Sequence, residues 1–202
     1  MTSPSLLCIA LLALRLPAAS PAAVQPPAPA LAPAPQVFLT VDEALELAFP
    51  DAEVKRTRAF LSAAEEERVG KLAHRKYKGR TLMHYVAHRD GKVIGTAYLD
   101  THEVRSKKET LMIVVDPAGK VRRVEVLAFG EPREYIPIDR WYGQFPGEQL
   151  GDDLELKRGI KGVTGATLTG RATVTAVRQV LAKHKVLAER ATPAAPEQSA
   201  AR

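Results

Sequence analysis

The feature that most constrains the fold is the stretch from residue 81 to 129, in which β-rich runs alternate with turn signals. Asp90-Gly91 separates TLMHYVAHR from KVIGTAYLDTHEV, and Pro117-Ala118-Gly119-Lys120 separates ETLMIVVD from KVRRVEVLAF. Such turn residues between β-branched runs are typical of antiparallel hairpins. The stretch therefore predicts an antiparallel sheet meander. In KVRRVEVLAF apolar and charged residues alternate, which predicts that one face of the sheet is exposed to solvent.

Helices are predicted on both sides of this meander. Thr40 followed by Glu43, and Ser62 followed by Glu65, match the capping-box pattern and predict helices over TVDEALELAF and SAAEEERVGKLAHR. A strand is predicted between them, over residues 54–61. The order of elements predicts an α+β fold, with N-terminal helices, the meander and a closing C-terminal helix, rather than a doubly wound sheet.

The closing helix is predicted from Gly170 to Leu187. Its apolar stripe has helical spacing and predicts the buried face. The stripe consists of Val174, Val177, Val180 and Leu181. The basic residues of this segment fall outside the stripe, so they are expected on the solvent side; they are Arg178, Lys183 and Lys185.

The two ends of the chain differ in composition from the predicted domain, which spans residues 37–188. Residues 1–22 contain an apolar run followed by small residues, which indicates a signal peptide, with an uncleaved N-terminal anchor as the alternative. Residues 23–36 are rich in proline and alanine and predict an extended linker. Residues 189–202 predict a disordered tail. A leader of this kind predicts a periplasmic or otherwise extracytoplasmic protein, secreted or anchored at the membrane.

Composition and motif content exclude several classes of function. The net charge is +6, but the basic residues are scattered, which argues against binding of nucleic acid. Cys8, in the leader, is the one cysteine of the sequence, so the domain has no disulfide or cysteine-ligated metal. His84 and His88 stand in a strand pattern with no third ligand, so no metal site is predicted. The sequence contains no P-loop and no GxGxxG, GxSxG or HExxH motif.

The segment KGVTGATLTGRATV, residues 161–174, carries the chemistry. It combines three glycines with threonines at 164, 167 and 169, directly before the predicted closing helix. A glycine-rich turn that leads into a helix N-terminus presents free N–H groups and favours anions. The segment therefore indicates a phosphate-bearing ligand. The alternative is an ordinary helix start with Thr169 as the N-cap.

Within this segment, TGATLT resembles the flavin-attachment motif of the FMN-binding domain family. That family includes the C subunit of the sodium-pumping NADH:quinone reductase and the G subunit of the Rnf complex. The resemblance implies that Thr169 takes FMN through a phosphoester bond installed by a flavin transferase. It further implies that the surrounding residues contact the cofactor: Thr164, Gly165, Ala166, Thr167, Leu168, Glu131 and Pro132.

The likeness extends over roughly residues 80–187, through the strand pair around Asp116-Pro117, the Glu131-Pro132 loop and the segment RWYGQF. Besides Leu168 and the loop, Tyr135 and Trp141 are candidates to contact the flavin ring. The sequence departs from the family pattern at Lys161, where the family has Asp, and at Gly170, which often is serine. Lys161 either impairs recognition by the transferase or pairs with the FMN phosphate.

Three functions are consistent with these features. The first is an extracytoplasmic electron carrier with covalent FMN, whose partners are the transferase and redox donor and acceptor proteins, some of them membrane-bound. The second is a binding or structural module in which the flavin motif has degenerated. The third is a flavin-dependent reductase for a small extracellular substrate. Substrate-dependent turnover distinguishes the third, and flavin colour distinguishes the second.

Overall fold

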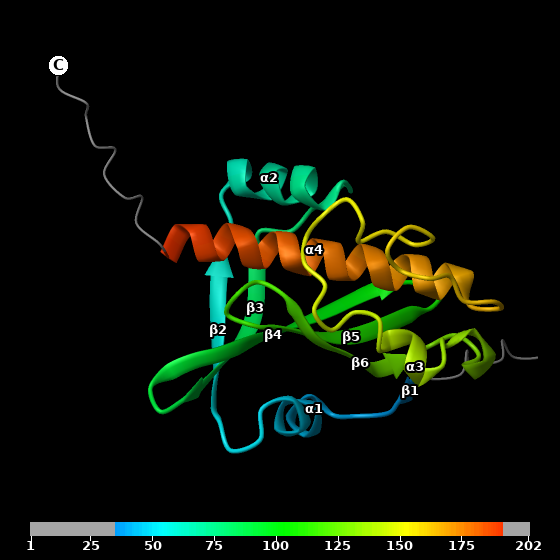
Figure 1. Cartoon of the computed structure of the whole chain (residues 1–202), viewed down its shortest axis with the longest axis horizontal. Helices are drawn as coiled ribbons and strands as arrows, with labels where there is room; N and C mark the ends of the chain where they lie inside the picture. The colour runs from blue at the N-terminus through cyan, green and yellow to red at the C-terminus, as the bar shows by residue number, and fades with distance from the viewer. Residues whose placement is uncertain (1–34, 192–202) are drawn as a thin grey trace, which may run out of the picture. The chain divides into compact units, whose positions relative to one another are not determined.

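The computed structural model describes residues 35–191. Its centre is one antiparallel sheet of six strands in the order β1-β6-β5-β4-β3-β2 (Figure 1). The strands are β1 (Gln36–Val37), β2 (Glu53–Phe60), β3 (Thr81–Arg89), β4 (Lys92–Glu103), β5 (Lys108–Val115) and β6 (Val121–Phe129). Strands β2 to β6 are neighbours in chain order, so the predicted meander is confirmed. Asp90 has a positive φ of 52° and Gly91 one of 73°, which is the backbone of a tight hairpin turn.

The helices lie on both sides of the sheet, with α2 and α4 on one side and α1 on the other (Figure 1). They are α1 (Val41–Ala48), α2 (Ala63–Ala73), α3 (Asp139–Tyr142) and α4 (Thr167–Ala191), with a 3₁₀ turn η1 (Arg133–Tyr135). Both predicted capping boxes are present: Glu43 N–H donates to the Thr40 hydroxyl, and Glu65 N–H to the Ser62 hydroxyl. The α+β prediction is confirmed.

The prediction of one solvent-exposed sheet face is wrong at the centre of the sheet. In β5, Leu111 and Ile113 pack in the core under α4, whereas Met112 and Val114 pack in a second core with α1. All four side chains are fully buried. The alternation in β6 was misleading because β6 lies near the edge of the sheet, where its charged residues reach solvent. Even in β6, Leu127 packs in the core on the α1 side.

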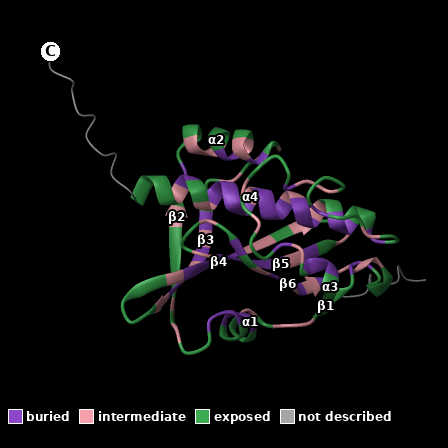
Figure 2. Cartoon of the chain, viewed as in Figure 1, coloured by how far each residue is buried: buried purple, intermediate pink, exposed green. Residues whose placement is uncertain are grey.

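The prediction that the basic residues of α4 face solvent is wrong for Arg178 and Lys183, which are both buried. Figure 2 shows that the middle of α4 is buried around most of its circumference. The cause is that α4 packs against the sheet on one side and against α2 on another, where Ala182 and Val186 meet Val69. A helix covered from several sides buries polar residues, which then need partners.

At the two ends, the predicted leader and most of the linker lie outside the described residues, as does most of the predicted tail. Gln36, assigned to the linker, pairs with Phe129 in β1–β6. Helix α4 continues to Ala191, beyond the predicted helix end at Leu187. Between residues 35 and 191, no helix has the length and apolar character needed to span a membrane.

Candidate functional site

The threonine- and glycine-rich segment forms a turn that enters α4. Gly165 has a φ of 83°, in the region that glycine adopts most easily, and open space surrounds the position where a Cβ would lie. The first intrahelical hydrogen bond joins Gly170 N–H to the Ala166 carbonyl at 2.9 Å. Helix α4 therefore begins at Thr167, three residues earlier than predicted. Thr169 lies in the first turn and is not the N-cap.

The turn is fixed to α3 and to the residues that follow it by hydrogen bonds to the backbone of Lys161. Trp141 Nε1 donates to the Lys161 carbonyl at 2.7 Å, and Lys161 N–H donates to Gln144 Oε1 at 2.9 Å. The Trp141 ring also lies against Gly170, where a Cβ would be 3.2 Å from the ring atom Cζ2. A glycine at this position lets the ring approach the helix start. Trp141 therefore braces the turn from behind.

A hollow of about 180 Å³, here called the motif hollow, lies beside the turn. It brings together six of the eight residues predicted for the site, and it also contains Val104, Arg105 and Tyr135. The six are Glu131, Gly165, Ala166, Thr167, Leu168 and Thr169. Thr164 does not line it, and neither does Pro132, which follows Glu131 and precedes η1. Trp141 lies behind the turn and not in the hollow.

The hydroxyl of Thr169 lies beside the hollow but already forms a hydrogen bond within the protein. The residue is 1% exposed, and its Oγ1 donates to the Tyr135 carbonyl at 2.6 Å. Thr167 and Thr164 are exposed, and Thr167 Oγ1 donates to the Val163 carbonyl at 3.3 Å. Attachment of a group to Thr169 thus requires that its hydroxyl leave Tyr135, which lies at the end of the short turn η1.

Glu131 organises the opposite wall of the motif hollow. Its carboxylate oxygen Oε1 accepts hydrogen bonds from Ser106 N–H at 2.6 Å and from Lys107 N–H at 2.8 Å. These bonds, that from Ser106 first, hold the pKa of Glu131 below its usual range. The ionised carboxylate is thereby committed to holding the β4–β5 loop, and this loop supplies Arg105 to the hollow.

Arg105 is the residue that sequence reasoning missed. It lines the motif hollow, and its guanidinium lies 5.4 Å from the centre of the Tyr135 ring. An arginine suits phosphate because its guanidinium offers several N–H donors in one plane. The signal in the sequence was the basic run RSKK in a predicted hairpin loop, but only the fold brings that loop to the motif.

A groove of about 300 Å³ continues from the motif hollow between β4 and α4, here called the β4–α4 groove. Val104 and Leu168 line both. Its floor carries Asp100 and His102, and its other wall is the first half of α4 from Leu168 to Gln179. The two hollows therefore adjoin, and both are lined by polar and apolar residues, which is typical of cofactor sites.

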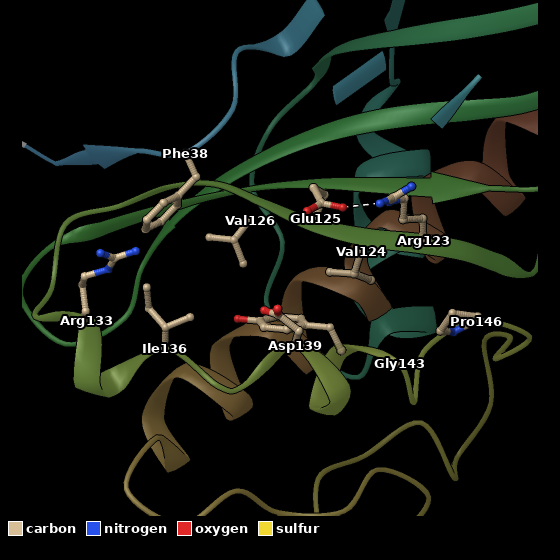
Figure 3. A pocket seen from close by; sticks show the side chains of 11 residues that line it. Phe38, Arg123, Val124, Glu125, Val126, Arg133, Ile136, Asp139, Gly143 and Pro146 are labelled. Atoms are coloured by element: carbon tan, nitrogen blue, oxygen red, sulfur yellow. Dashed lines mark hydrogen bonds and ion pairs between the residues drawn. The ribbon is translucent and has the colours of Figure 1, made fainter. Parts of the chain in front are cut away.

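Larger hollows lie elsewhere, and two of them bear on the predicted site. One of about 580 Å³ lies between β6 and residues 133–146, and Figure 3 shows Arg133 beside Phe38 and the Arg123–Glu125 ion pair at its rim. None of the predicted site residues lines it. Lys161, with Thr164 and Ala166, lines the other, of about 770 Å³. Lys161 is absent from the lining of the motif hollow, so the structure does not support its pairing with a phosphate there.

Comparison with known proteins decides what the site is for. Residues 77–182, just over half of the chain, match the FMN-binding domain family. The chain belongs to this family. Its cofactor is FMN, and the matched region spans the β4–β5 loop, the Glu131 loop and the TGATLT turn, so the motif hollow lies entirely within the FMN-binding domain.

A solved structure with the same fold is NqrC from Shewanella oneidensis. The two share 18% sequence identity with a TM-score of 0.51, over 73% of this chain and 88% of the NqrC chain. At this identity the likeness establishes the fold of the FMN-binding domain alone. No protein of curated function matches the sequence.

The residues of the motif hollow fit the cofactor. The first amides of α4 have no partner within the helix, so they are available to a phosphate. Arg105 adds a positive charge, and Leu168 and Tyr135 offer surfaces for the apolar ring. These residues would hold FMN in this FMN-binding domain, and the cofactor itself supplies the redox chemistry.

We predict that Gly130→Ala destabilises the loops that form the motif hollow. A Cβ at Gly130 would lie 2.9 Å from Lys107 Cβ and 3.0 Å from the Lys108 carbonyl oxygen. Because backbone must move to make room, the free energy of unfolding should fall by about 1–3 kcal/mol. Urea unfolding measures this. Gly151→Ala is the control, since a Cβ there meets nothing within 4 Å; equal loss in both variants would contradict the packing argument.

Proposed function

We propose that the protein is an extracytoplasmic electron carrier that holds FMN covalently, through a phosphoester bond to Thr169. The observation that carries the proposal is the motif hollow, in which Thr169, the start of α4 and Arg105 converge. An anion at this position is stabilised by the helix N-terminus and by the guanidinium. The predicted leader supports the location outside the cytoplasm, where lost cofactor is not easily replaced.

The attachment needs a separate flavin transferase. A threonine hydroxyl is a weak nucleophile unless a base activates it. No His, Asp or Glu occurs in the sequence between Gly159 and Val177, and the Thr169 hydroxyl donates to a backbone carbonyl rather than to a side-chain base. The transferase therefore supplies the base and displaces the Tyr135 contact. Redox donor and acceptor proteins complete the set of partners, with a membrane complex as the expected setting.

The electron-carrier role predicts rapid exchange with other redox proteins and no turnover of small substrates. We expect the flavin-loaded chain to be reduced by a one-electron donor and reoxidised by a protein or quinone acceptor. The amplitude of each step should correspond to one flavin per chain. Stopped-flow absorbance of the flavin measures both steps. Steady consumption of a small organic substrate, in catalytic excess over the flavin, would instead indicate a reductase.

A second candidate, a binding module without attached flavin, is favoured by one observation. Thr169 is 1% exposed and its hydroxyl is already engaged, so a chain that never opens this contact would remain unmodified. The two candidates differ in the absorbance of the purified protein, since only the carrier retains flavin colour after denaturation.

A further inference from the structure

Four ionisable side chains cluster beneath the β4–α4 groove, and the proposed function does not use them. His102 Nδ1 lies 2.9 Å from Asp100 Oδ1, and His102 Nε2 lies 3.0 Å from Glu109 Oε2. The second oxygen of Asp100 lies 3.5 Å from Lys183 Nζ. Both ring nitrogens therefore face carboxylates, an arrangement that favours the imidazolium form. We call these four residues the His102 cluster.

The cluster is buried, so that ionisation of its groups carries a free-energy cost. Glu109 is 0% exposed, and among residues 35–191 its oxygen Oε1 has no hydrogen-bond partner. Burial raises the pKa of Glu109 above its usual range. Burial alone would lower the pKa of His102, but its hydrogen bonds to Asp100 and Glu109 outweigh this and raise it to about 9. The groups thus depend on one another for their charge.

The cluster lies between two openings. On one side Asp100 and His102 form the floor of the β4–α4 groove, which shares Val104 and Leu168 with the motif hollow. On the other side Asp100, His102 and Lys183 line a polar hollow of about 540 Å³ bounded by residues 76–83 and β4. The groove adjoins the motif hollow through Val104 and Leu168, and the polar hollow exposes the cluster to solvent beside residues 76–83.

We propose that the His102 cluster is a proton-binding site coupled to the charge on the flavin. An electron from the donor protein adds negative charge in the motif hollow, and the proton held by the cluster compensates that charge. Where the cluster of the oxidised protein has already lost this proton, reduction takes it up from solvent. The bond that forms is an N–H or O–H bond within the cluster, and the electron stays on the cofactor. This inference rests on the proposed function, because it requires that FMN occupies the motif hollow.

Other charged and phenolic groups surround His102 and contribute a constant electrostatic potential at its ring. Within residues 35–191 they come from β4, from α3 and α4, and from the segment that follows α2. They are Tyr98, Glu103, Tyr142, Arg171, Lys76, Tyr77 and Lys78. Burial, and then the Glu109 carboxyl, raise the pKa of Tyr142 well above its usual range, so this phenol stays neutral where His102 titrates.

The coupling has a definite sign. Negative charge on the reduced flavin raises the pKa of His102 above its value in the oxidised protein. Below about pH 9 the ring is charged in both states, so it favours reduction without proton uptake. Between the pKa of His102 in the oxidised protein and its higher pKa in the reduced protein, reduction is accompanied by uptake of a proton at His102. In this range the midpoint potential of the flavin falls more steeply with pH. Coupling of this kind is reciprocal.

The first test compares the flavin potential of the wild type with that of His102→Gln between pH 6 and 11. We expect the variant to have the lower potential at pH 7, because it lacks the positive charge. The two curves should approach each other as the pH rises through about 9, where the oxidised wild type loses its proton, and converge above the higher pKa of His102 in the reduced protein. Parallel curves over the whole range would overturn the proposal, because a merely structural change shifts the potential without changing its pH dependence.

The second test needs no flavin. Leu168 is 46% exposed and lines both the motif hollow and the β4–α4 groove. In the unloaded full-length chain, Leu168→Glu should raise the pKa of His102, read from its imidazole proton signals by NMR, by about 0.5 or more relative to Leu168→Gln. Equal values would overturn the coupling. If the chain takes up no FMN, the proposed function fails, and this comparison alone decides whether the cluster senses charge in the hollow.

Discussion

Replacing Thr169 by alanine is expected to abolish covalent attachment of FMN, with a loss of the entire mass gain that the transferase produces on the wild-type chain. Thr169 Oγ1 donates to the carbonyl of Tyr135, and both residues line the motif hollow. The hydroxyl of Thr167, two residues earlier, donates to the backbone carbonyl of Val163. Intact mass spectrometry of the co-expressed proteins measures the result.

Thr167→Ala and Thr164→Ala are the matched controls, and both should keep the full mass gain. They are also the variants that would contradict the assignment. Both residues are more exposed than Thr169, so a transferase that selects the acceptor by exposure would modify one of them. Loss of the gain in Thr167→Ala with retention in Thr169→Ala would move the acceptor to Thr167.

The largest loss of stability is expected from Arg178→Ala. Arg178 is 1% exposed, and its guanidinium donates to three backbone carbonyls: from Nε to Ala73 at 2.9 Å, and from Nη1 to Gly151 at 2.7 Å and to Leu154 at 2.9 Å. It thereby joins the end of α2, the loop of residues 151–160 and α4. Truncation leaves these acceptors without a donor and opens a cavity, so the free energy of unfolding should fall by about 3–5 kcal/mol.

Arg171→Ala is the control for this prediction, because it removes the same side chain from an exposed position of the same helix. Its effect should stay within about 0.5 kcal/mol. Urea unfolding followed by circular dichroism compares the two. Similar small losses in both variants would mean that water replaces the Arg178 hydrogen bonds and that the three elements are held together by apolar packing alone.

The parts of the fold set by local sequence were predictable. Thr40 with Glu43 and Ser62 with Glu65 determine two helix starts through contacts three residues apart, and Asp90-Gly91 determines a hairpin turn. The start of α4 was placed too late, because Thr167 and Thr169 resemble capping residues although both are helical. Hydrophobic periodicity could not predict the burial of Arg178, since its partners are backbone carbonyls of distant segments.

The candidate site was predictable where its residues are contiguous in the sequence, and not where the fold brings distant residues together. The TGATLT turn is contiguous in the sequence, so its residues were found together, and Glu131 was found through the family resemblance. Arg105 and the His102 cluster depend on which loop and which strands the fold brings beside α4. The His102 cluster was not predicted, because Glu109 is brought beside His102 only by the β4–β5 register, whereas Asp100 lies two residues before His102 in β4.

The central claim is that this FMN-binding domain carries its cofactor covalently. The most direct test is intact mass spectrometry of the full chain after co-expression with an active flavin transferase. We expect a gain of one FMN less one water, which persists when the protein is denatured. An unchanged mass, while a reference acceptor in the same cells gains its flavin, would contradict it and favour the module without attached flavin.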